Sequence, residues 1–258
     1  MNKLVAIILS CTVLISCSDS QKLLSNPSNP TGNKSDAKPV NRMVPVEEPW
    51  VYYGTFPYLA ADKTLKTDKQ AQELPHDNSL LNPLCAWKET TTVLDITGGI
   101  SIQAPIITAS ANGEKYQVIY SFKKFTNIDS ANVRLQVGVE VRLTASFTTV
   151  KGSLNLSLSG IGAAASAGKL SGCMTLTLLG ASLPKIGEAF TATSSITAES
   201  IEKALQQIAT LKSMIFETDA VISPYVIGIE DLTSSTASLD WEATQQAANN
   251  LKSSFKLK

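Results

Sequence analysis

Apolar and polar side chains alternate without interruption between Val133 and Phe147. A period of two is typical of a β-strand that buries one face, because successive side chains point to opposite sides of the chain. The odd positions carry the apolar side chains, while the even positions carry polar ones such as Arg134 and Glu140. We therefore predict one long strand over 133–147, with its odd positions in the core and its even positions toward solvent.

Asn112-Gly113 predicts a hairpin before this strand. The pair lies between a strand-like segment over 91–111, which has a break near Gly98-Gly99, and an alternating segment over 115–125. Asn-Gly between two such segments is the strongest short hairpin signal, because both central residues of the turn need a positive φ. We expect the segments on either side of the turn to pair with each other.

Lys151-Gly152 predicts a second hairpin, from the long strand into a shorter one over 153–158. With a two-residue turn, Phe147 faces Leu156 across the hairpin. Apolar side chains then meet on one face, which is the condition that normally fixes strand register.

Three segments carry helical patterns. Alanines dominate 160–168, and Gly168 can end a short helix there. Thr197 can cap a second helix, whose apolar side chains recur every three or four residues. These side chains are Ile201, Leu205, Ile208, Leu211 and Ile215. A last helix follows Asp240 and presents one apolar face, either to the core or to a partner: Trp241, Ala248, Leu251 and Phe255.

Further strands over 173–179 and 220–229 complete the pattern, with Pro224 at an edge or a bulge. Strands followed by helices at the end of a chain indicate an α+β fold that is mainly β. We expect antiparallel strands, in a sheet or a sandwich, with two or three helices packed at the side. Residues 49–258 are enough for one such domain.

Charge and composition exclude one class of partner. Lysine and arginine total 22, and aspartate and glutamate also total 22. A chain without a basic excess has no long-range field to attract nucleic acid, and no clustered basic face is visible. We expect no nucleic-acid partner.

The first 17 residues resemble the signal peptide of bacterial lipoproteins. Lys3 precedes an apolar run over 4–15, and Leu14-Ile15-Ser16-Cys17 has the form of a lipobox. The run is too short to span a bilayer, which takes roughly 20 residues of helix. The resemblance implies that residues 1–16 are removed and that Cys17 carries fatty acyl chains such as palmitate. Two or three such chains give stable attachment to membrane lipid.

An address in the cell envelope follows from this resemblance. Ser18 rather than Asp comes after Cys17, which in lipoproteins of this kind favours the outer membrane, on its periplasmic face or at the cell surface. Residues 17–48 are rich in Ser, Asn, Pro and Lys. This segment contains few apolar side chains, and their burial cannot offset the entropy lost when the chain is ordered. We therefore expect residues 17–48 to form a disordered tether.

Two cysteines remain in the expected mature domain, Cys85 and Cys173. In an oxidising compartment they can form one disulfide. The alternative is two separately buried thiols. A metal site is not expected, because His76 is the one histidine and the cysteines lack ligand spacing.

Aromatic side chains gather at the start of the predicted domain, at Trp50, Tyr52, Tyr53, Phe56 and Tyr58. Such a group can form a stacking surface for a glycan or a docking strand for a partner protein. It can equally be a first strand whose rings pack into the core. We keep these five residues as a candidate binding surface.

Catalytic and cofactor motifs are absent from the sequence. The neighbours His76 and Asp77 are typical of a solvated turn, and we expect no catalytic residue and no cofactor. A hydrolase with an unrecognised carboxylate site stays possible, and its candidate residues are Asp95, Glu114, Asp129 and Glu140.

Membrane insertion is a further alternative, because Lys169 is the one formal charge between Gly152 and Pro184. The strands predicted there are shorter than the roughly 9–11 residues that a spanning strand needs. The interpretation that we favour is therefore a lipid-anchored binding or assembly domain of the envelope. Its partner would be an envelope protein or a glycan.

Overall fold

Two long antiparallel strands form the centre of the fold, β7 (Lys115–Ser130) and β8 (Val133–Thr149). They pair along their whole length, from Lys115 opposite Thr148 to Ser130 opposite Val133. The predicted strand over 133–147 is thus confirmed. Its odd positions from Leu135 to Phe147 are buried, and their side chains belong to the main hydrophobic core, whereas Val133 is half-buried.

The structure is a computed structural model that describes residues 43–96, 100–102, 106–130, 132–184, 193–233 and 241–254. The predicted signal peptide, the acylated Cys17 and most of the expected tether lie outside the described residues. Residues from Val40 to Lys258 form one compact unit.

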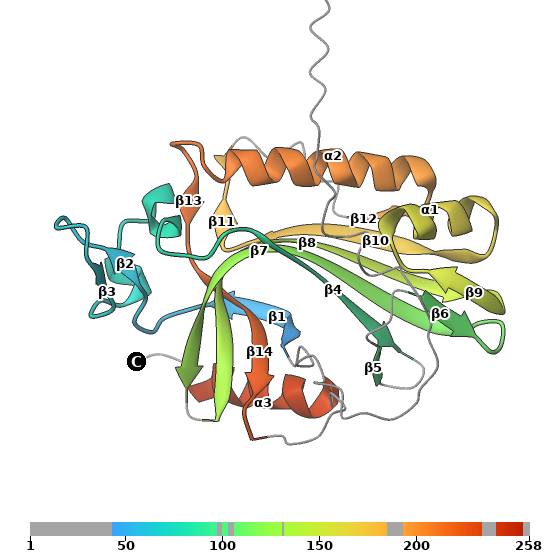
Figure 1. Ribbon diagram of the computed structural model, residues 1–258, viewed down its shortest axis with the longest axis horizontal. Coiled ribbons are helices and arrows are strands. Elements are labelled where there is room, and N and C mark those ends of the chain that lie inside the picture. Colours follow the sequence, from blue (N-terminus) through green and yellow to red (C-terminus); the bar gives the residue numbers. More distant parts are fainter. Residues whose placement is uncertain are drawn as a thin grey trace, which may run out of the picture. The chain divides into compact units, whose positions relative to one another are not determined.

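An eight-stranded antiparallel sheet contains β7 and β8 (Figure 1). Its order among the described strands is β1-β14-β8-β7-β4-β5, and β10 also pairs with β8 and carries β12 on its far side. The remaining strands of this sheet are β1 (Val44–Val51), β4 (Lys88–Asp95), β5 (Ile100–Ile102), β10 (Leu170–Leu179), β12 (Thr193–Ser195) and β14 (Tyr225–Asp231).

Short ribbons and helices complete the described chain. The ribbons are β2 (Tyr58–Leu59) with β3 (Leu65–Lys66), β6 (Ile106–Ala109) with β9 (Gly152–Asn155), and β11 (Ala181–Ser182) with β13 (Val221–Ile222). The α-helices are α1 (Leu158–Ser166), α2 (Ala198–Met214) and α3 (Trp241–Ser254), and two 3-10 helices are η2 (Ala71–Glu73) and η3 (Asn78–Leu81). The fold is therefore α+β and mainly β, as the sequence predicts.

One edge of β8 is shared by two strands in succession. β14 pairs with its first part, as far as Gly138, and β10 pairs with its second part, from Glu140 onward. Gly180 directly follows β10 at this junction and has a φ of 78°. A Cβ atom there would lie 2.4 Å from the carbonyl oxygen of Gly138. Only glycine fits this position without a shift of backbone.

Gly180→Ala is therefore expected to reduce the free energy of unfolding by about 2–4 kcal/mol, from strain at positive φ together with the backbone collision. Gly168→Ala is the matched control. Gly168 also has a positive φ, of 67°, but open space surrounds its missing Cβ atom. Its loss is expected to be about 1 kcal/mol. Urea unfolding measures both, and equal losses would remove the steric part of the argument.

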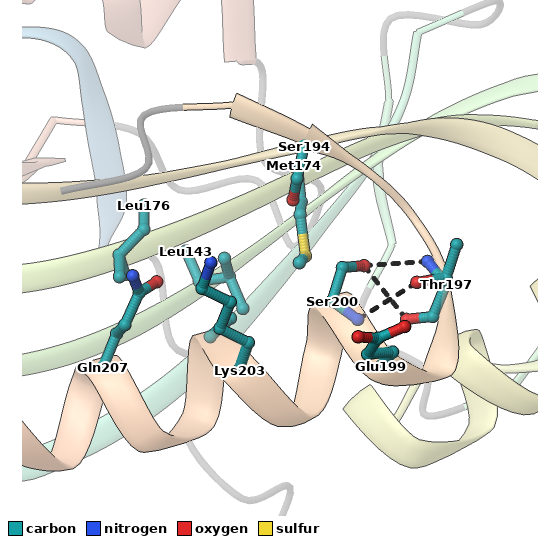
Figure 2. A pocket seen from close by; sticks show the side chains of 10 residues that line it. Leu143, Met174, Leu176, Ser194, Thr197, Glu199, Ser200, Lys203 and Gln207 are labelled. Atoms are coloured by element: carbon teal, nitrogen blue, oxygen red, sulfur yellow. Dashed lines mark hydrogen bonds between the residues drawn. The ribbon is translucent and has the colours of Figure 1, made fainter. Parts of the chain in front are cut away.

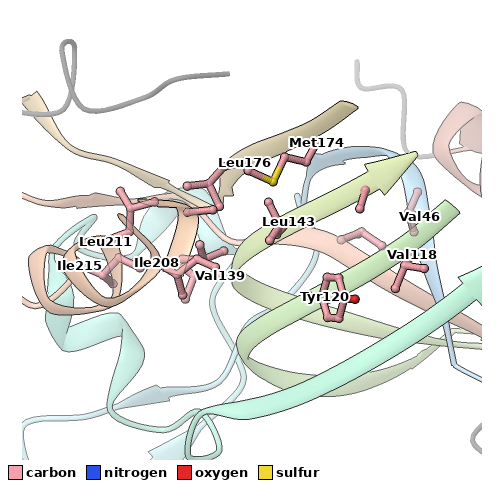
Figure 3. Packing of buried hydrophobic residues seen from close by; sticks show 14 of the residues in the cluster. Val46, Val118, Tyr120, Val139, Leu143, Met174, Leu176, Ile208, Leu211 and Ile215 are labelled. Atoms are coloured by element: carbon pink, nitrogen blue, oxygen red, sulfur yellow. The ribbon is translucent and has the colours of Figure 1, made fainter. Parts of the chain in front are cut away.

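Helices α2 and α1 cover one face of the sheet (Figure 1). The predicted cap at Thr197 is confirmed, because its side chain accepts a hydrogen bond from the backbone N–H of Ser200. Ile208, Leu211 and Ile215 pack on this face beside Val139 of β8 (Figure 3). Leu205 is exposed, however, and Ala204 takes the buried position instead. The stripe was thus predicted correctly except at one position.

Helix α3 lies on the opposite side of the sheet, against β1 and β14 (Figure 1). Its first residue, Trp241, forms a small separate core with Val44, Leu94 and Ile119. Ala248 of the same helix is fully buried. The apolar face predicted for the last helix is thus packed within this domain, although Phe255 lies outside the described residues.

The hairpin predicted at Asn112-Gly113 is confirmed only in part, because the first part of the segment over 91–111 lies in β4 and pairs with β7, whereas the part next to the turn is β6 and does not. The turn is there, with a φ of 89° at Gly113. The strands on either side of it do not pair, because β6 pairs with β9, whereas β7 pairs with β4 and β8. The turn connects two different ribbons of the fold.

The second predicted hairpin, at Lys151-Gly152, is wrong. Phe147 lies opposite Gly172 of β10 rather than opposite Leu156. The segment after Gly152 is β9, which leaves the main sheet to pair with β6. Leu154 and Leu156 still reach the core, but by this different route.

Two boundaries also differ from the predictions. The folded part begins before residue 49, because Val44–Val51 forms β1. The strand predicted over 220–229 is divided into β13 and β14 on either side of Pro224. The short helix and the strand after it are confirmed as α1 and β10, and Gly168 follows α1 with a φ of 67°.

Candidate functional site

The aromatic group at the start of the domain contributes mainly to the core. Trp50, Tyr52 and Phe56 are buried in the main hydrophobic cluster. Tyr53 and Tyr58 are half-buried. These five rings therefore do not form a shared stacking surface, and this candidate binding surface was wrong for at least its three buried members.

The predicted Cys85–Cys173 disulfide is not formed. Both residues are free thiols, Cys85 half-buried and Cys173 exposed. The backbone N–H of Cys85 bonds to Phe125, which is opposite Gly138, whereas Cys173 is opposite Ser146. Eight residues of β8 separate those positions, or about 26 Å, and a disulfide needs Cα atoms within about 7 Å. The expected alternative of two buried thiols fails for Cys173.

His76 has a structural environment. Its Nδ1 atom lies 2.7 Å from the carbonyl oxygen of Ile222, and its own carbonyl accepts a bond from the N–H of Ile222. Asp77 caps η3, where its carboxylate accepts a bond from the N–H of Ser79. The side chains of His76 and Asp77 thus bond to two separate backbone segments.

The candidate carboxylates are spread over the sheet, with Asp95 at the end of β4 and the other three along the β7–β8 pair. Glu114 precedes one end of β7, Asp129 lies near the other end and bonds Arg134, and Glu140 is buried between them. Glu114 accepts bonds from the hydroxyl groups of Ser110 and Tyr116, which lower its pKa to about 2. A general acid needs a raised pKa, so Glu114 is unsuited to that role.

A groove lies beside the first turns of α2 (Figure 2). Its floor consists of Leu143 from β8 with Met174 and Leu176 from β10, and Ala204 of α2 also lines it. The volume is about 210 Å³. Leu143, Met174, Leu176 and Ala204 are at most 4% exposed, so the groove offers only a small apolar surface at its floor.

Polar side chains form the rim of this groove (Figure 2). Glu199 and Lys203 bring opposite charges, and Gln207 brings an amide. The hydroxyl groups of Thr197 and Ser200 are fixed by the helix cap, since Ser200 Oγ also donates a bond to the carbonyl oxygen of Ser195 at 2.7 Å. The rim thus offers donors and acceptors in defined positions around an apolar floor.

The size and lining of the groove restrict its ligand. Sites for whole small molecules usually have about 300–1,000 Å³, so this groove suits a single side chain or a fragment of that size. Its lining contains aliphatic and methionine side chains and no aromatic ring. A sugar would therefore lack a stacking partner here. An apolar side chain of a protein segment fits the groove better than a glycan.

A buried polar cluster lies on the other face of the sheet. Arg142 donates to the carbonyl oxygens of Val46 and Ile227, at 2.7 and 3.1 Å, and to Glu140 at 2.8 Å. Both carbonyls belong to irregular parts of β1 and β14, where the ladder register shifts. Arg142 thus supplies hydrogen bonds at places where the ladder is interrupted.

Lys123 belongs to the same cluster, opposite Glu140 on β7. Burial lowers the pKa of Lys123, although the Glu140 charge opposes that shift, and its Nζ bonds to Gln136 at 2.6 Å. Glu140 Oε1 and Arg142 Nε have no hydrogen-bond partner in the part of the chain that the structure describes. The cluster is closed to solvent, and we assign it a structural role.

Neither the buried polar cluster nor the groove is evident from the hydrophobic pattern of the sequence. The even positions of β8 were predicted to face solvent, yet Gln136, Glu140 and Arg142 are buried. The signal in the sequence is an opposite-charge pair at i and i+2, on one face of a long strand. The groove has a weaker signal, because its lining comes from β8, β10, β12 and α2.

No protein-family model matches the chain. No curated protein and no solved structure matches it either. Among the residues that the structure describes, no three His, Cys, Asp or Glu side chains gather as a metal site. None of the helices in those same ranges combines the length and the apolar character needed to cross a membrane. The groove is therefore interpreted from its own geometry.

Proposed function

We propose that this chain is a lipid-anchored protein of the bacterial cell envelope whose domain is a non-catalytic binding or assembly module. The lipobox supports the anchor, because Cys17 follows an apolar run and a small residue. The groove under α2 supports the binding role. Its ligand in this proposal is an apolar side chain from a segment of an envelope protein.

The single observation that carries this proposal is the apolar floor of Leu143, Met174 and Leu176 beneath a polar rim. A binding site of this kind buries one anchor and orients it with a few polar groups. β12, which pairs with β10 alone among the described strands, lies at the same place. An extended segment can add to such an edge while one of its side chains enters the groove.

Ala204→Phe tests the groove directly. Ala204 lines the groove, so a phenylalanine there fills the space that the partner would use. A photo-crosslinking amino acid at Gln207, on the rim, is introduced into the full-length chain in intact bacterial cells. We expect a specific crosslinked product, which Ala204→Phe reduces by roughly tenfold or more. Mass spectrometry of the product identifies the partner.

Ala209→Phe is the matched control, because Ala209 lies on the exposed side of the same helix. It should leave the product unchanged, and a crosslinker at the exposed Gln206 should yield none. Equal losses with both phenylalanine variants, or no product from position 207, would contradict the proposed site. Thermal unfolding of each variant shows whether the domain is intact.

A further inference from the structure

The hairpin of β2 and β3 has two different faces and extends to one side of the domain (Figure 1). On one face Tyr58 packs against the main core cluster and so fixes the hairpin to the domain. On the other face Leu59 and Leu65 lie directly opposite each other, 49% and 61% exposed. Two neighbouring leucines are thus displayed to solvent on a ribbon whose other face is anchored.

The turn of this hairpin is fixed by its own hydrogen bonds. The N–H of Ala60 donates to the carbonyl oxygen of Thr64, and the N–H of Lys63 donates to that of Ala60, both at 2.9 Å. The carboxylate of Asp62 accepts a bond from the N–H of Thr64 at 3.0 Å. Lys63 has a φ of 63°, a conformation that is strained for a residue with a side chain. The leucines are therefore held in place before any partner binds.

The charges around the leucines are positive on balance. Between positions 59 and 69 there are three lysines and two aspartates, so the sum is +1. Asp62 is 3.7 Å from Lys66 Nζ, and Asp68 accepts a bond from the hydroxyl of Tyr58 at 3.0 Å. Both carboxylates are thus engaged within the hairpin. Asp62 offsets Lys66, whereas Asp68 keeps its negative charge, so Lys63 at the turn and Lys69 at the base leave a net charge of +1.

An apolar hollow continues this surface at the base of the hairpin. Its volume is about 290 Å³, and its lining includes Leu59, Leu74, Pro75 and Leu80. Lys69 lies beside it, with Nζ 5.2 Å from the centre of the Tyr58 ring. Apolar surface and ammonium groups therefore occur together along one edge of the domain.

We propose that the Leu59/Leu65 hairpin docks on the surface of a bilayer that contains anionic phospholipid. The leucines enter the boundary between headgroups and acyl chains, and Lys63, Lys66 and Lys69 approach the phosphates. Exposed apolar side chains flanked by lysines are the usual composition of segments that bind such surfaces. This inference rests on the proposed lipid anchor only in that the anchor keeps the hairpin beside the bilayer. Its physical basis is separate.

The experiment uses the mature chain without its lipid. A non-lipidated signal sequence replaces residues 1–17, so that the secreted product begins at Ser18. Sedimentation with vesicles compares phosphatidylcholine alone with an equal mixture of phosphatidylcholine and phosphatidylglycerol. We expect binding to the mixed vesicles only, weakened by added salt, and a decrease of roughly tenfold in the partition coefficient for Leu59→Ser/Leu65→Ser.

Val150→Ser/Leu205→Ser is the control, because those side chains are similarly exposed but lie elsewhere on the domain. It should bind as the parent chain does. The inference fails if the parent chain binds neither kind of vesicle, or if the control loses as much binding as the leucine variant. It also fails if crosslinking in cells places Leu65 against a protein instead of lipid. Acylation of Cys17 is measured separately, so failure of the anchor is distinguishable from failure of the hairpin.

Discussion

Arg142→Met is expected to reduce the free energy of unfolding by about 3–5 kcal/mol, as measured by urea denaturation of the secreted chain. The substitution removes the guanidinium that bonds to the buried Glu140 carboxylate and leaves Lys123 as its neighbouring cation. It also removes the donors that the carbonyl oxygens of Val46 and Ile227 use. Both β1 and β14 should loosen, because each loses a bond at an irregular part of its ladder.

Arg134→Met is the matched control on the same strand. Arg134 bonds Asp129 and lies near Glu230, but all three side chains are more accessible to solvent than the Arg142 cluster. Since surface ion pairs contribute little, its effect should be much smaller than that of Arg142→Met. Glu140→Met/Arg142→Met removes both charges together and should recover only the part of the loss that comes from the uncompensated Glu140 carboxylate, because the carbonyl oxygens of Val46 and Ile227 still lack their donors and Lys123 loses its opposite charge. If Arg142→Met is no more damaging than Arg134→Met, the bridging role is wrong.

Cys17→Ala is expected to abolish acylation of the protein and with it the stable attachment to the membrane. The substitution removes the sulfur that would carry the acyl chains, and each buried CH₂ of such a chain contributes about 0.8 kcal/mol to attachment. Labelled palmitate should enter the parent protein and not the variant. After phase separation in a nonionic detergent, the parent protein should partition into the detergent-rich phase and the variant into the aqueous one.

Cys11→Ala is the corresponding control, because Cys11 lies within the apolar run of the same segment. It should leave both labelling and partitioning as in the parent protein. The lipid anchor would be refuted by a parent chain without label, or by a Cys17→Ala chain that keeps its label.

Local signals in the sequence predicted the elements that depend on neighbouring residues. The strand over 133–147 follows from a period of two, and the start of α2 follows from a cap at Thr197. Glycine also marked true turns, since Gly113 and Gly152 both have positive φ. The chemistry of a few adjacent residues is sufficient for predictions of this kind.

Strand partners could not be predicted in the same way. A turn residue permits the chain to reverse, but it does not choose which strand lies alongside. β7 pairs with β4 rather than with the segment just before its turn, and β8 pairs with β10 rather than with β9. These choices depend on packing between segments that are distant in the sequence, as in the core of β8, α2 and β10.

β1 is another element that local sequence patterns could not predict. Pro45, Glu47 and Glu48 made the segment before residue 49 unlike a strand. β1 forms because α3 supplies hydrogen bonds where the ladder between β1 and β14 is irregular. Gln245 donates to the carbonyl oxygen of Pro45 at 2.8 Å and accepts from the N–H of Glu47 at 3.1 Å. Its partners come from nearly two hundred residues along the chain, beyond the range of any local pattern.

The pairing of β1 with β14 also has a consequence for biosynthesis. Val44 lies opposite Ile229, so β1 cannot pair with β14 until most of the chain has left the ribosome. Because contacts this distant form late, the sheet cannot be completed during synthesis. An exported polypeptide must cross the inner membrane before it folds if it takes a narrow translocation pore. If the chain is exported as proposed, this topology would keep it in that export-competent state.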